Sequence, residues 1–296
     1  MRNLLTWIGT IGFLGAVGYF APTFAPTFLE STLFEQGNSA RDQAFEDCRS
    51  GDTARQIEGC SWLIDNRDGL SNEDLSMAFH NRGQGHSETD NHEQAFADYD
   101  EAIRLEPDDY ITYYVRGFLH QYREDYEAAV ADYTLALELE TEDPDVYRDR
   151  ALSLYYVGKY EESLPDLYAA LKIDPDHAET LNSLAWTLLS LGRAEQALPI
   201  SAKSLEEDGE KSANSLDTYA HIMAELGRKQ EALEYFVKAA RMGDTYYVRQ
   251  IQHALSAKGF LSSPPDGVMT GRTRDALKAC IAQNCQLQLT EPDTGS

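Results

Sequence analysis

The sequence is short of basic residues. Its 296 residues include 25 Lys and Arg against 50 Asp and Glu, which gives a formal net charge of −25. A chain of this charge is repelled by phosphate backbones, so the composition argues against nucleic-acid binding. Proline is also scarce, with 10 residues, while 42% of the residues are hydrophobic. This balance indicates a folded protein rather than a disordered one.

Common catalytic motifs are missing as well. The sequence contains no G-x-S-x-G, H-E-x-x-H, P-loop or G-x-G-x-x-G pattern. His80, His86 and His92 recur every sixth residue, a spacing that spreads them around a helix hairpin instead of bringing them together. The sequence therefore predicts no enzyme, no metal site and no cofactor.

Charge is absent from a long amino-terminal stretch. After Arg2 the next charged residue is Glu30, so residues 4–29 form an uncharged run. About 20 apolar residues suffice to span a bilayer, so residues 1–30 are predicted to be a membrane anchor or signal segment. The best cleavage site, at 16–18, is weak, which favours an uncleaved inner-membrane anchor with the body in the periplasm. The alternative is a soluble periplasmic protein after signal cleavage.

From residue 80 onward the sequence repeats with an offset of 34 residues. Small residues recur at two positions of the repeat, and Pro or Thr occupies a third position at the end of each copy. The three sets are Ala95, Ala129 and Ser163; Ala102, Ala136 and Ala170; and Pro107, Thr141 and Pro175. Two fainter copies follow, the last after a one-residue slip. A repeat of this length predicts helix hairpins stacked into a solenoid.

These copies resemble the tetratricopeptide repeat family, in which small residues lie where the two helices of a hairpin touch and proline marks the exit. The resemblance covers five repeats over residues 76–246. A degenerate hairpin over residues 37–70 precedes them, with Gly51 and Asp52 at its turn. The resemblance implies an all-α solenoid over about two thirds of the chain.

One contact is predicted from the repeats themselves. The first three copies carry an Arg and, sixteen residues later, an Asp; the pairs are Arg82 with Asp98, Arg116 with Asp132, and Arg150 with Asp166. In the fourth and fifth copies both partners are replaced together, by Leu184 with Ile200 and by Tyr219 with Tyr235. Positions that change together favour an ion pair inside each of the first three hairpins; the alternative is charges on solvated faces.

In each repeat, the side of the first helix that is opposite its buried side forms a stripe, and this stripe carries aromatic residues. In the tetratricopeptide repeat family this stripe lines the concave groove, so the resemblance implies binding of a protein or peptide there. The predicted groove residues are Tyr114, Phe118, Tyr122, Arg148, Leu152, Tyr155, Tyr156, Asn182 and Trp186. The alternative is that the tyrosines fill space between helices.

Residues 247–287 resemble a small three-helix peptidoglycan-binding domain. The matching residues are Gln252, Leu255, Gly259, Phe260, Asp266, Gly267, Thr273 and Ala276, and Thr270 is predicted to cap the last helix. The segment has five basic and two acidic residues, so it is positive in a negative chain. Arg249, Lys258, Arg272 and Arg274 are therefore candidates for binding the anionic cell-wall polymer. The alternative is that this domain caps the solenoid or contacts protein.

Four cysteines occur as two local pairs, and an even count in an exported chain suggests disulfides. Three connectivities are possible, and we favour Cys48–Cys60 with Cys280–Cys285. The predicted architecture is thus a transmembrane helix, a helix-hairpin solenoid, a small peptidoglycan-binding-like domain and a flexible tail at 288–296. The predicted function is a non-enzymatic bacterial envelope scaffold that binds a protein and peptidoglycan; the alternative is an assembly factor whose last domain only caps the solenoid.

Overall fold

The fold was analysed in a computed structural model that describes residues 40–139, 142–243 and 245–285. Residues 40–48 are helical. The helices that follow are α2 (Thr53–Asp65), α3 (Asn72–Glu88), α4 (His92–Leu105), α5 (Tyr110–Tyr122), α6 (Tyr126–Leu139), α7 (Pro144–Tyr156), α8 (Tyr160–Ile173), α9 (Ala178–Ser190), α10 (Ala194–Asp208), α11 (Ala213–Glu225), α12 (Lys229–Met242), α13 (Thr245–Ala257) and α14 (Gly271–Ala282).

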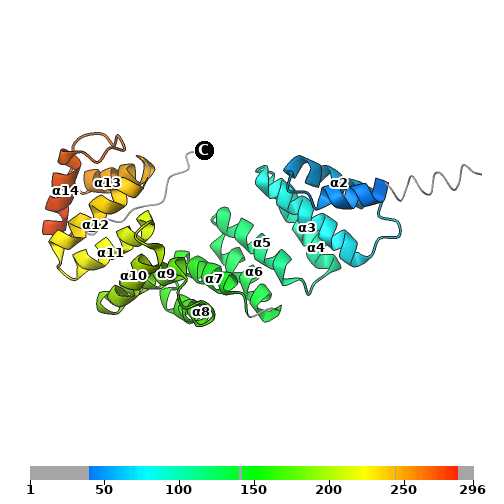
Figure 1. Ribbon diagram of the computed structural model, residues 1–296, viewed down its shortest axis with the longest axis horizontal. Coiled ribbons are helices and arrows are strands. Elements are labelled where there is room, and N and C mark those ends of the chain that lie inside the picture. The colour runs from blue at the N-terminus through cyan, green and yellow to red at the C-terminus, as the bar shows by residue number, and fades with distance from the viewer. Residues whose placement is uncertain (1–39, 140–141, 244, 286–296) are drawn as a thin grey trace, which may run out of the picture.

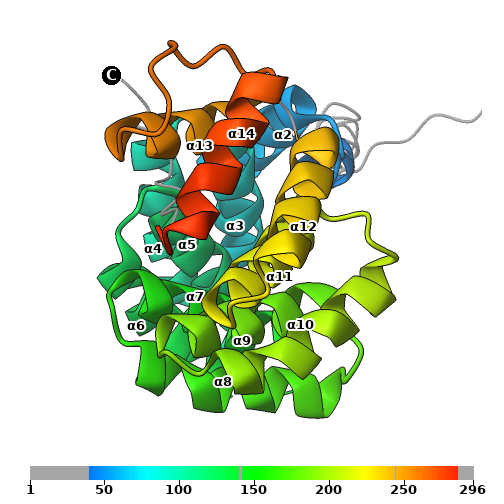
Figure 2. The same cartoon turned by 90° about the vertical axis from the view of Figure 1, so that its left-hand side faces the viewer.

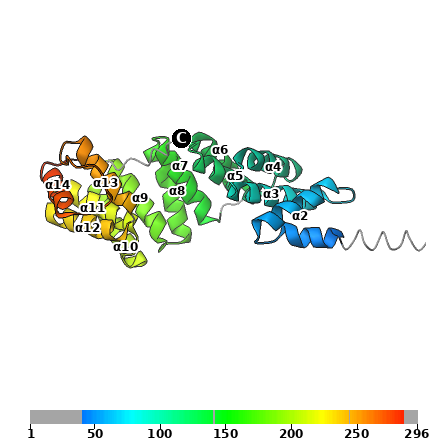
Figure 3. The same ribbon diagram turned by 90° about the horizontal axis from the view of Figure 1, so that it is seen from above.

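The helices pair into antiparallel hairpins that follow one another along an arc (Figure 1). Helices α3 to α12 form five hairpins, and each hairpin packs on the next one along the chain. Figure 2 looks along the arc from the α14 end and shows the helices arranged around a curved path, whereas Figure 3 shows its extended length. This is the all-α solenoid that the 34-residue period predicts.

Local sequence sets where the helices begin and end. Ser71 caps α3 through a reciprocal pair of hydrogen bonds with Asp74, which satisfies amides that have no partner in the first turn. Gly158, Gly192 and Gly227 follow the ends of α7, α9 and α11 with φ between +73° and +80°. A side chain is disfavoured in that conformation, so glycine ends these helices at low cost.

Within a hairpin the two helices meet at small residues. Ala95, Ala129 and Ser163 are fully buried. A Cβ added to Gly117 would lie 2.9 Å from the ring of Tyr133, so this glycine lets α5 and α6 approach closely. The small residues that reveal the repeat are therefore those that bring the helices together.

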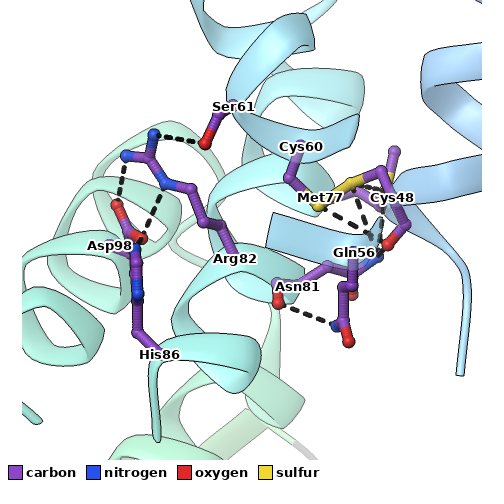
Figure 4. Close-up of a disulfide and its surroundings, with 9 residues drawn as sticks. All are labelled: Cys48, Gln56, Cys60, Ser61, Met77, Asn81, Arg82, His86 and Asp98. Atoms are coloured by element: carbon purple, nitrogen blue, oxygen red, sulfur yellow. Dashed lines mark hydrogen bonds and ion pairs between the residues drawn. A yellow bond between two sulfur atoms is a disulfide. The ribbon is translucent and has the colours of Figure 1, made fainter. Parts of the chain in front are cut away.

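The predicted ion pairs are confirmed in all three hairpins. Each guanidinium makes two hydrogen bonds to the carboxylate of its partner. The Nη2–Oδ1 distances are 2.6 Å for Arg82–Asp98, 2.7 Å for Arg116–Asp132 and 2.7 Å for Arg150–Asp166. The carboxylates are buried and the guanidinium groups half-buried, so each pair joins the two helices of one hairpin from within. Figure 4 shows the first pair, with Arg82 also donating to Ser61.

The two repeats without ion pairs use the same place for apolar contacts. Leu184 is buried, and Ile200 packs against the same apolar cluster. The rings of Tyr219 and Tyr235 lie 4.5 Å apart between centroids. The position therefore always joins helix to helix, by charge in three hairpins and by packing in two.

A disulfide joins Cys48 to Cys60 across the first hairpin, and a second joins Cys280, in the last turn of α14, to Cys285 just beyond it. These are the local pairs that we favoured. Cys48, Cys60 and Leu63 are fully buried. The side-chain amide of Asn81 on α3 donates to the backbone carbonyl of Cys48, and the backbone carbonyl of Asn81 accepts from the side chain of Gln56 (Figure 4). The bridged hairpin is thereby tied to the first full repeat.

The carboxyl-terminal segment departs from the three-helix expectation. Within residues 245–285 the structure has two helices, α13 and α14, joined by a loop that contains Pro264 and Pro265. Consecutive prolines disfavour a helix because they remove backbone donors. The loop is held by Gln252, which donates to Asp266 and accepts from the amide of Gly267. The expected cap is confirmed, since Thr270 accepts from the amide of Thr273.

This segment also shares its core with the last repeat. Phe236 of α12, Ile251 and Leu255 of α13 and Leu277 of α14 belong to one cluster of buried residues. The two helices therefore cover the end of the solenoid instead of forming a separate core.

The predicted anchor at residues 4–29 and the tail at 288–296 lie outside the described residues. Across 40–139, 142–243 and 245–285, no helix has the length and apolar character needed to cross a bilayer.

The ion pairs make a first prediction. Asp166→Ala leaves the half-buried Arg150 without its partner and should lower the free energy of unfolding by about 3 kcal/mol. The double change Arg150→Leu with Asp166→Ile copies the pair Leu184 and Ile200 and should cost less than about 1 kcal/mol. Urea unfolding followed by circular dichroism measures both. A double variant as unstable as the single one would contradict the pairing.

The disulfides make a second prediction. Peptide mapping without reductant should recover Cys48 linked to Cys60 and Cys280 linked to Cys285. Replacing Cys48 and Cys60 by Ser should destabilise the first hairpin by about 3 kcal/mol, because the unfolded loop is no longer constrained. Limited proteolysis should then cut within residues 40–65 before the repeats. Recovery of a Cys48–Cys285 or Cys60–Cys280 peptide would show that the local pairing is wrong.

Candidate functional site

A hollow lies on the inside of the arc. It has a volume of about 890 Å³, and its lining comes mainly from α7, α9, α11 and α13. We call it the groove. Its main side chains are Arg148, Leu152, Tyr155 and Tyr156 of α7; Glu179, Asn182 and Trp186 of α9; Asn214, Asp217 and Thr218 of α11; and Tyr246, Tyr247 and Gln250 of α13.

The repeat places equivalent residues side by side along this surface. One position of the first helix is occupied in successive repeats by His80, Tyr114, Arg148, Asn182 and Asp217, at spacings of 34 residues and finally 35. We call this set the inner row. Stacked hairpins bring such positions next to one another, so the inner row runs across the helices. Its last three members line the groove.

Most members of the inner row bind the next repeat. His80 lies 2.8 Å from the hydroxyl of Thr112, and Tyr114 donates to Asp149 at 2.9 Å. Arg148 binds Asp145 at 2.6 Å and Asp149 at 3.0 Å on its own helix, and it lies 3.8 Å from Glu179 of the next repeat. Burial raises the pKa of the Asp149 carboxyl, whereas Arg148 opposes that rise. These contacts couple neighbouring hairpins through polar groups.

Asn182 differs from its neighbours in the inner row. Its Oδ1 atom is buried, and it has no hydrogen-bond partner among the described residues. A buried amide oxygen without a donor costs free energy of about 1–3 kcal/mol. Asn182 also lines the groove. Its Oδ1 atom faces away from solvent, so a ligand in the groove supplies the missing donor only when the side-chain amide rotates to turn Oδ1 toward the groove.

Beside Asn182 the groove has an aromatic wall. Trp186 donates from Nε1 to the hydroxyl of Tyr155 at 2.7 Å, and this hydroxyl lies 3.0 Å from Ser190. The rings of Tyr155 and Tyr156 meet edge to face at 5.7 Å between centroids. The rings are thus fixed before any partner binds, and rigid aromatic surfaces are typical of interface hot spots.

Asp217 lies at the base of the groove, at the end formed by α11 and α13. It accepts a hydrogen bond of 2.5 Å from Tyr247, and His221 Nε2 lies 3.5 Å from its other oxygen. Burial raises the pKa of the Asp217 carboxyl and lowers the pKa of His221. The ring of His221 in turn lies 5.3 Å from Trp186, edge to face. Asp217 therefore links α11 to α13 below the groove.

Six of the nine predicted groove residues line it together: Arg148, Leu152, Tyr155, Tyr156, Asn182 and Trp186. Tyr114, Phe118 and Tyr122 lie one repeat earlier and do not line it. Phe118 and Tyr122 are more than half exposed, whereas Tyr114 is half-buried with its hydroxyl bound to Asp149. The aromatic stripe thus continues beyond the groove, but Tyr114 serves the contact between repeats.

The four basic candidates of the carboxyl-terminal segment are all exposed. Arg249 lies on α13, Arg272 and Arg274 on the first turn of α14, and Lys258 just after α13. Arg249 is close enough to Asp266 to help lower the pKa of that carboxyl, after the larger effects of hydrogen bonds from Gln252 and Val268.

The histidines of the first repeat lie apart from the groove. His86 lies 3.8 Å from Asp98, and His92 lies 3.8 Å from Asp90. In the part of the chain that the structure describes, no three His, Cys, Asp or Glu side chains are grouped to hold a metal ion.

Sequence reasoning missed Asp217, Tyr246, Tyr247 and Gln250. The signal for Asp217 was present, because adding the slipped spacing of 35 residues to Asn182 leads to it. Tyr247 and Gln250 were missed because residues 247–287 were assigned to a separate domain, whereas α13 packs as the next element of the solenoid.

Comparison with known proteins agrees with this architecture. Residues 78–109 and 110–143 match one model of the tetratricopeptide repeat, and residues 150–254 match another. No curated protein matches the chain in sequence.

Solved structures share the fold. YrrB, described as a TPR protein with an unusual peptide-binding site, is 22% identical with a TM-score of 0.51, over 62% of this chain and 90% of YrrB. A MamA structure is 15% identical with a TM-score of 0.52, over 64% of this chain and 98% of MamA. MamA AMB-1 is 18% identical with a TM-score of 0.53, over 60% and 93%. At these identities the likeness concerns the fold alone.

The buried Asp217 predicts a dependence on pH. Its pKa is raised by folding, so its contribution to stability is complete at low pH and is lost as pH rises through the folded pKa. Asp217→Asn keeps an acceptor for Tyr247 without the charge. Its free energy of unfolding should match the wild type at the lowest pH and exceed it increasingly as the pH rises above the range in which an unfolded aspartate titrates. Urea unfolding from acidic to neutral pH measures the difference.

The matched control is Asp108→Asn, since Asp108 is exposed in the loop between α4 and α5. This change should shift stability by less than about 0.5 kcal/mol at every pH. An Asp217→Asn effect that stayed constant with pH would contradict the buried carboxylate account.

Proposed function

From the tetratricopeptide repeats of residues 78–143 and 150–254, we propose that the chain is a non-enzymatic adaptor of the bacterial envelope. It binds a segment of another protein in the groove and peptidoglycan through residues 247–287. The repeats suit the chain to protein–protein interaction, and the remaining elements of this proposal rest on the features below.

The groove carries the protein-binding part. It joins a preformed aromatic wall at Trp186 and Tyr155 to a buried oxygen of Asn182 that lacks a donor. An extended protein segment offers a main-chain N–H and side chains of alternating direction, which complement both features. YrrB, which has the same fold, is described as having a peptide-binding site. A protein segment is therefore the ligand that the lining suits best.

The peptidoglycan part rests on the residues of the carboxyl-terminal segment. The exposed Arg249, Lys258, Arg272 and Arg274 form a basic surface on a chain of net charge −25. Such a local surface attracts an anionic polymer while the rest of the chain repels it. The loop that matches the peptidoglycan-binding pattern is held in place by Gln252.

A second function for this segment has its own support. The apolar side of α13 and α14 shares one core with α11 and α12, and Tyr246, Tyr247 and Gln250 line the groove. These contacts favour the alternative in which the segment caps the solenoid of an assembly factor and completes its protein-binding surface. Capping uses the buried side and wall binding the exposed side, so the two roles are separable by mutation.

The location follows from the sequence. We propose an inner-membrane anchor at residues 4–29 with the repeats in the periplasm, or a soluble periplasmic form after cleavage. The two cysteine pairs agree with an oxidising compartment.

The groove is tested by photo-crosslinking in cells that produce the full chain. A photoreactive phenylalanine analogue replaces Ser183 or Asn214 in the groove, and Leu135 or Tyr168 on the exposed faces of α6 and α8 serves as the control. We expect the two groove positions to capture the same protein, which mass spectrometry identifies. Capture of that protein from the control positions alone would overturn the assignment.

The wall-binding part is tested by co-sedimentation of the full chain, in mild detergent, with isolated sacculi. Arg272→Glu combined with Arg274→Glu should reduce the bound fraction by about tenfold at low salt, and added salt should weaken the wild type. Lys172→Glu, on exposed α8, is the matched control and should bind as the wild type does. Equal sedimentation of all three proteins would leave only the capping role.

A further inference from the structure

The proposed groove function leaves open which protein segments the groove accepts. One helix carries most of the selective chemistry, because Glu179, Asn182 and Trp186 lie three and four residues apart on α9 and all line the groove. At a rise of about 1.5 Å per residue they extend over about 10 Å of the helix. An extended peptide covers that length with about three residues.

Asn182, the middle of these three residues, requires a hydrogen-bond donor from the ligand. Asn182 Oδ1 is buried and has no hydrogen-bond partner in the part of the chain that the structure describes. The other members of the inner row that line the groove, Arg148 and Asp217, are already bound to neighbouring side chains. A main-chain N–H is the donor that a peptide presents whatever its sequence, so Asn182 fixes the backbone of a bound segment.

The charge of the groove wall determines which side chains of a ligand it favours. Arg148 is the one basic residue among the described residues that line the groove, and three carboxylates lie within 4.0 Å of it. The carboxylates belong to Asp145, Asp149 and Glu179, so this wall has more negative than positive charge. Glu179 lies 3.8 Å from Arg148 and its side chain is 80% exposed, which leaves it accessible to a ligand.

The solenoid as a whole also carries a net negative charge. Residues 72–243 contain 15 basic and 36 acidic side chains, so the solenoid repels acidic segments and attracts basic ones over the distance of a Debye length. At the other end of the α9 stripe, Trp186 and Leu152 give an apolar surface for a large side chain.

We propose that the groove selects an extended, basic protein segment in which a Lys or Arg lies within three residues of a large apolar side chain. The side-chain amide of Asn182 rotates so that Oδ1 faces the groove and accepts a hydrogen bond from the main chain of the segment. The cationic group of the segment lies at Glu179, and its apolar side chain packs on Trp186 and Leu152. This inference rests on the proposed function, because it specifies the ligand of the same groove.

The test uses the full-length protein in mild detergent and a random library of 12-residue peptides displayed on phage. Selected peptides should be enriched in Lys and Arg over Asp and Glu, relative to the unselected library, with Leu, Phe or Trp nearby. The most frequent peptide is then synthesised and titrated by fluorescence polarisation. Changing its Lys or Arg to Glu should weaken binding by about tenfold at low salt, with a smaller effect at high salt.

Three variants locate the contacts. Asn182→Leu should weaken the peptide by about tenfold, the upper range for one neutral hydrogen bond, while its thermal unfolding midpoint stays equal to or above that of the wild type. Glu179→Gln should weaken it by about threefold and reduce the effect of salt. The control Glu195→Gln, exposed on α10 and outside the groove, should bind within about twofold of the wild type.

The outcomes separate this inference from the function on which it rests. Selected peptides that bind in competition with one another but are acidic or uncharged would overturn the basic specificity and leave groove binding intact. Wild-type affinity in Asn182→Leu would overturn the backbone contact. Failure of the library to yield any peptide that binds would overturn groove binding itself, and this inference with it.

Discussion

Each helix hairpin in this chain can bury its second face only against the next hairpin, and that constraint organises the rest of the structure. Stacking requires close approach within a hairpin, which Ala129 and Gly117 allow, and a fixed link between its helices, which the pairs such as Arg116 with Asp132 provide. Once the hairpins stack in register, residues 34 positions apart become neighbours. The inner row and the groove are consequences of that register.

The period itself was therefore enough to predict the fold, the hairpins and the Arg–Asp contacts. Six of the predicted groove residues also come together, because residues such as Arg148 and Asn182 occupy equivalent positions in stacked repeats. What could not be predicted depends on contacts between segments of different pattern. The role of Tyr114 depends on a hydrogen bond to Asp149 in the next repeat, and Tyr247 enters the groove only because α13 packs on the last hairpin. The helical periodicity of the sequence indicates neither the hydrogen bond of Tyr114 nor the packing of α13.

The carboxyl-terminal segment shows how one element serves two surfaces. Its apolar residues, including Ile251 and Leu277, close the end of the solenoid, whereas its basic residues remain exposed. A solenoid end left uncovered would expose apolar side chains, so a cap is needed whatever else the segment binds. The acidic solenoid and the basic cap also differ in the sign of their charge, so the two ligands that we propose, a cationic peptide and an anionic polymer, would be attracted to different parts of the chain.

Hydrogen–deuterium exchange of the full-length protein, alone and copurified with its natural partner, tests the central claim that ligands bind on the inner helices of the arc. The account predicts slower exchange on binding in residues 148–156, 179–187 and 213–218, which contribute to the groove, with little change in α8 and α10. Protection confined to α8 and α10, with unchanged exchange across the groove, would contradict it.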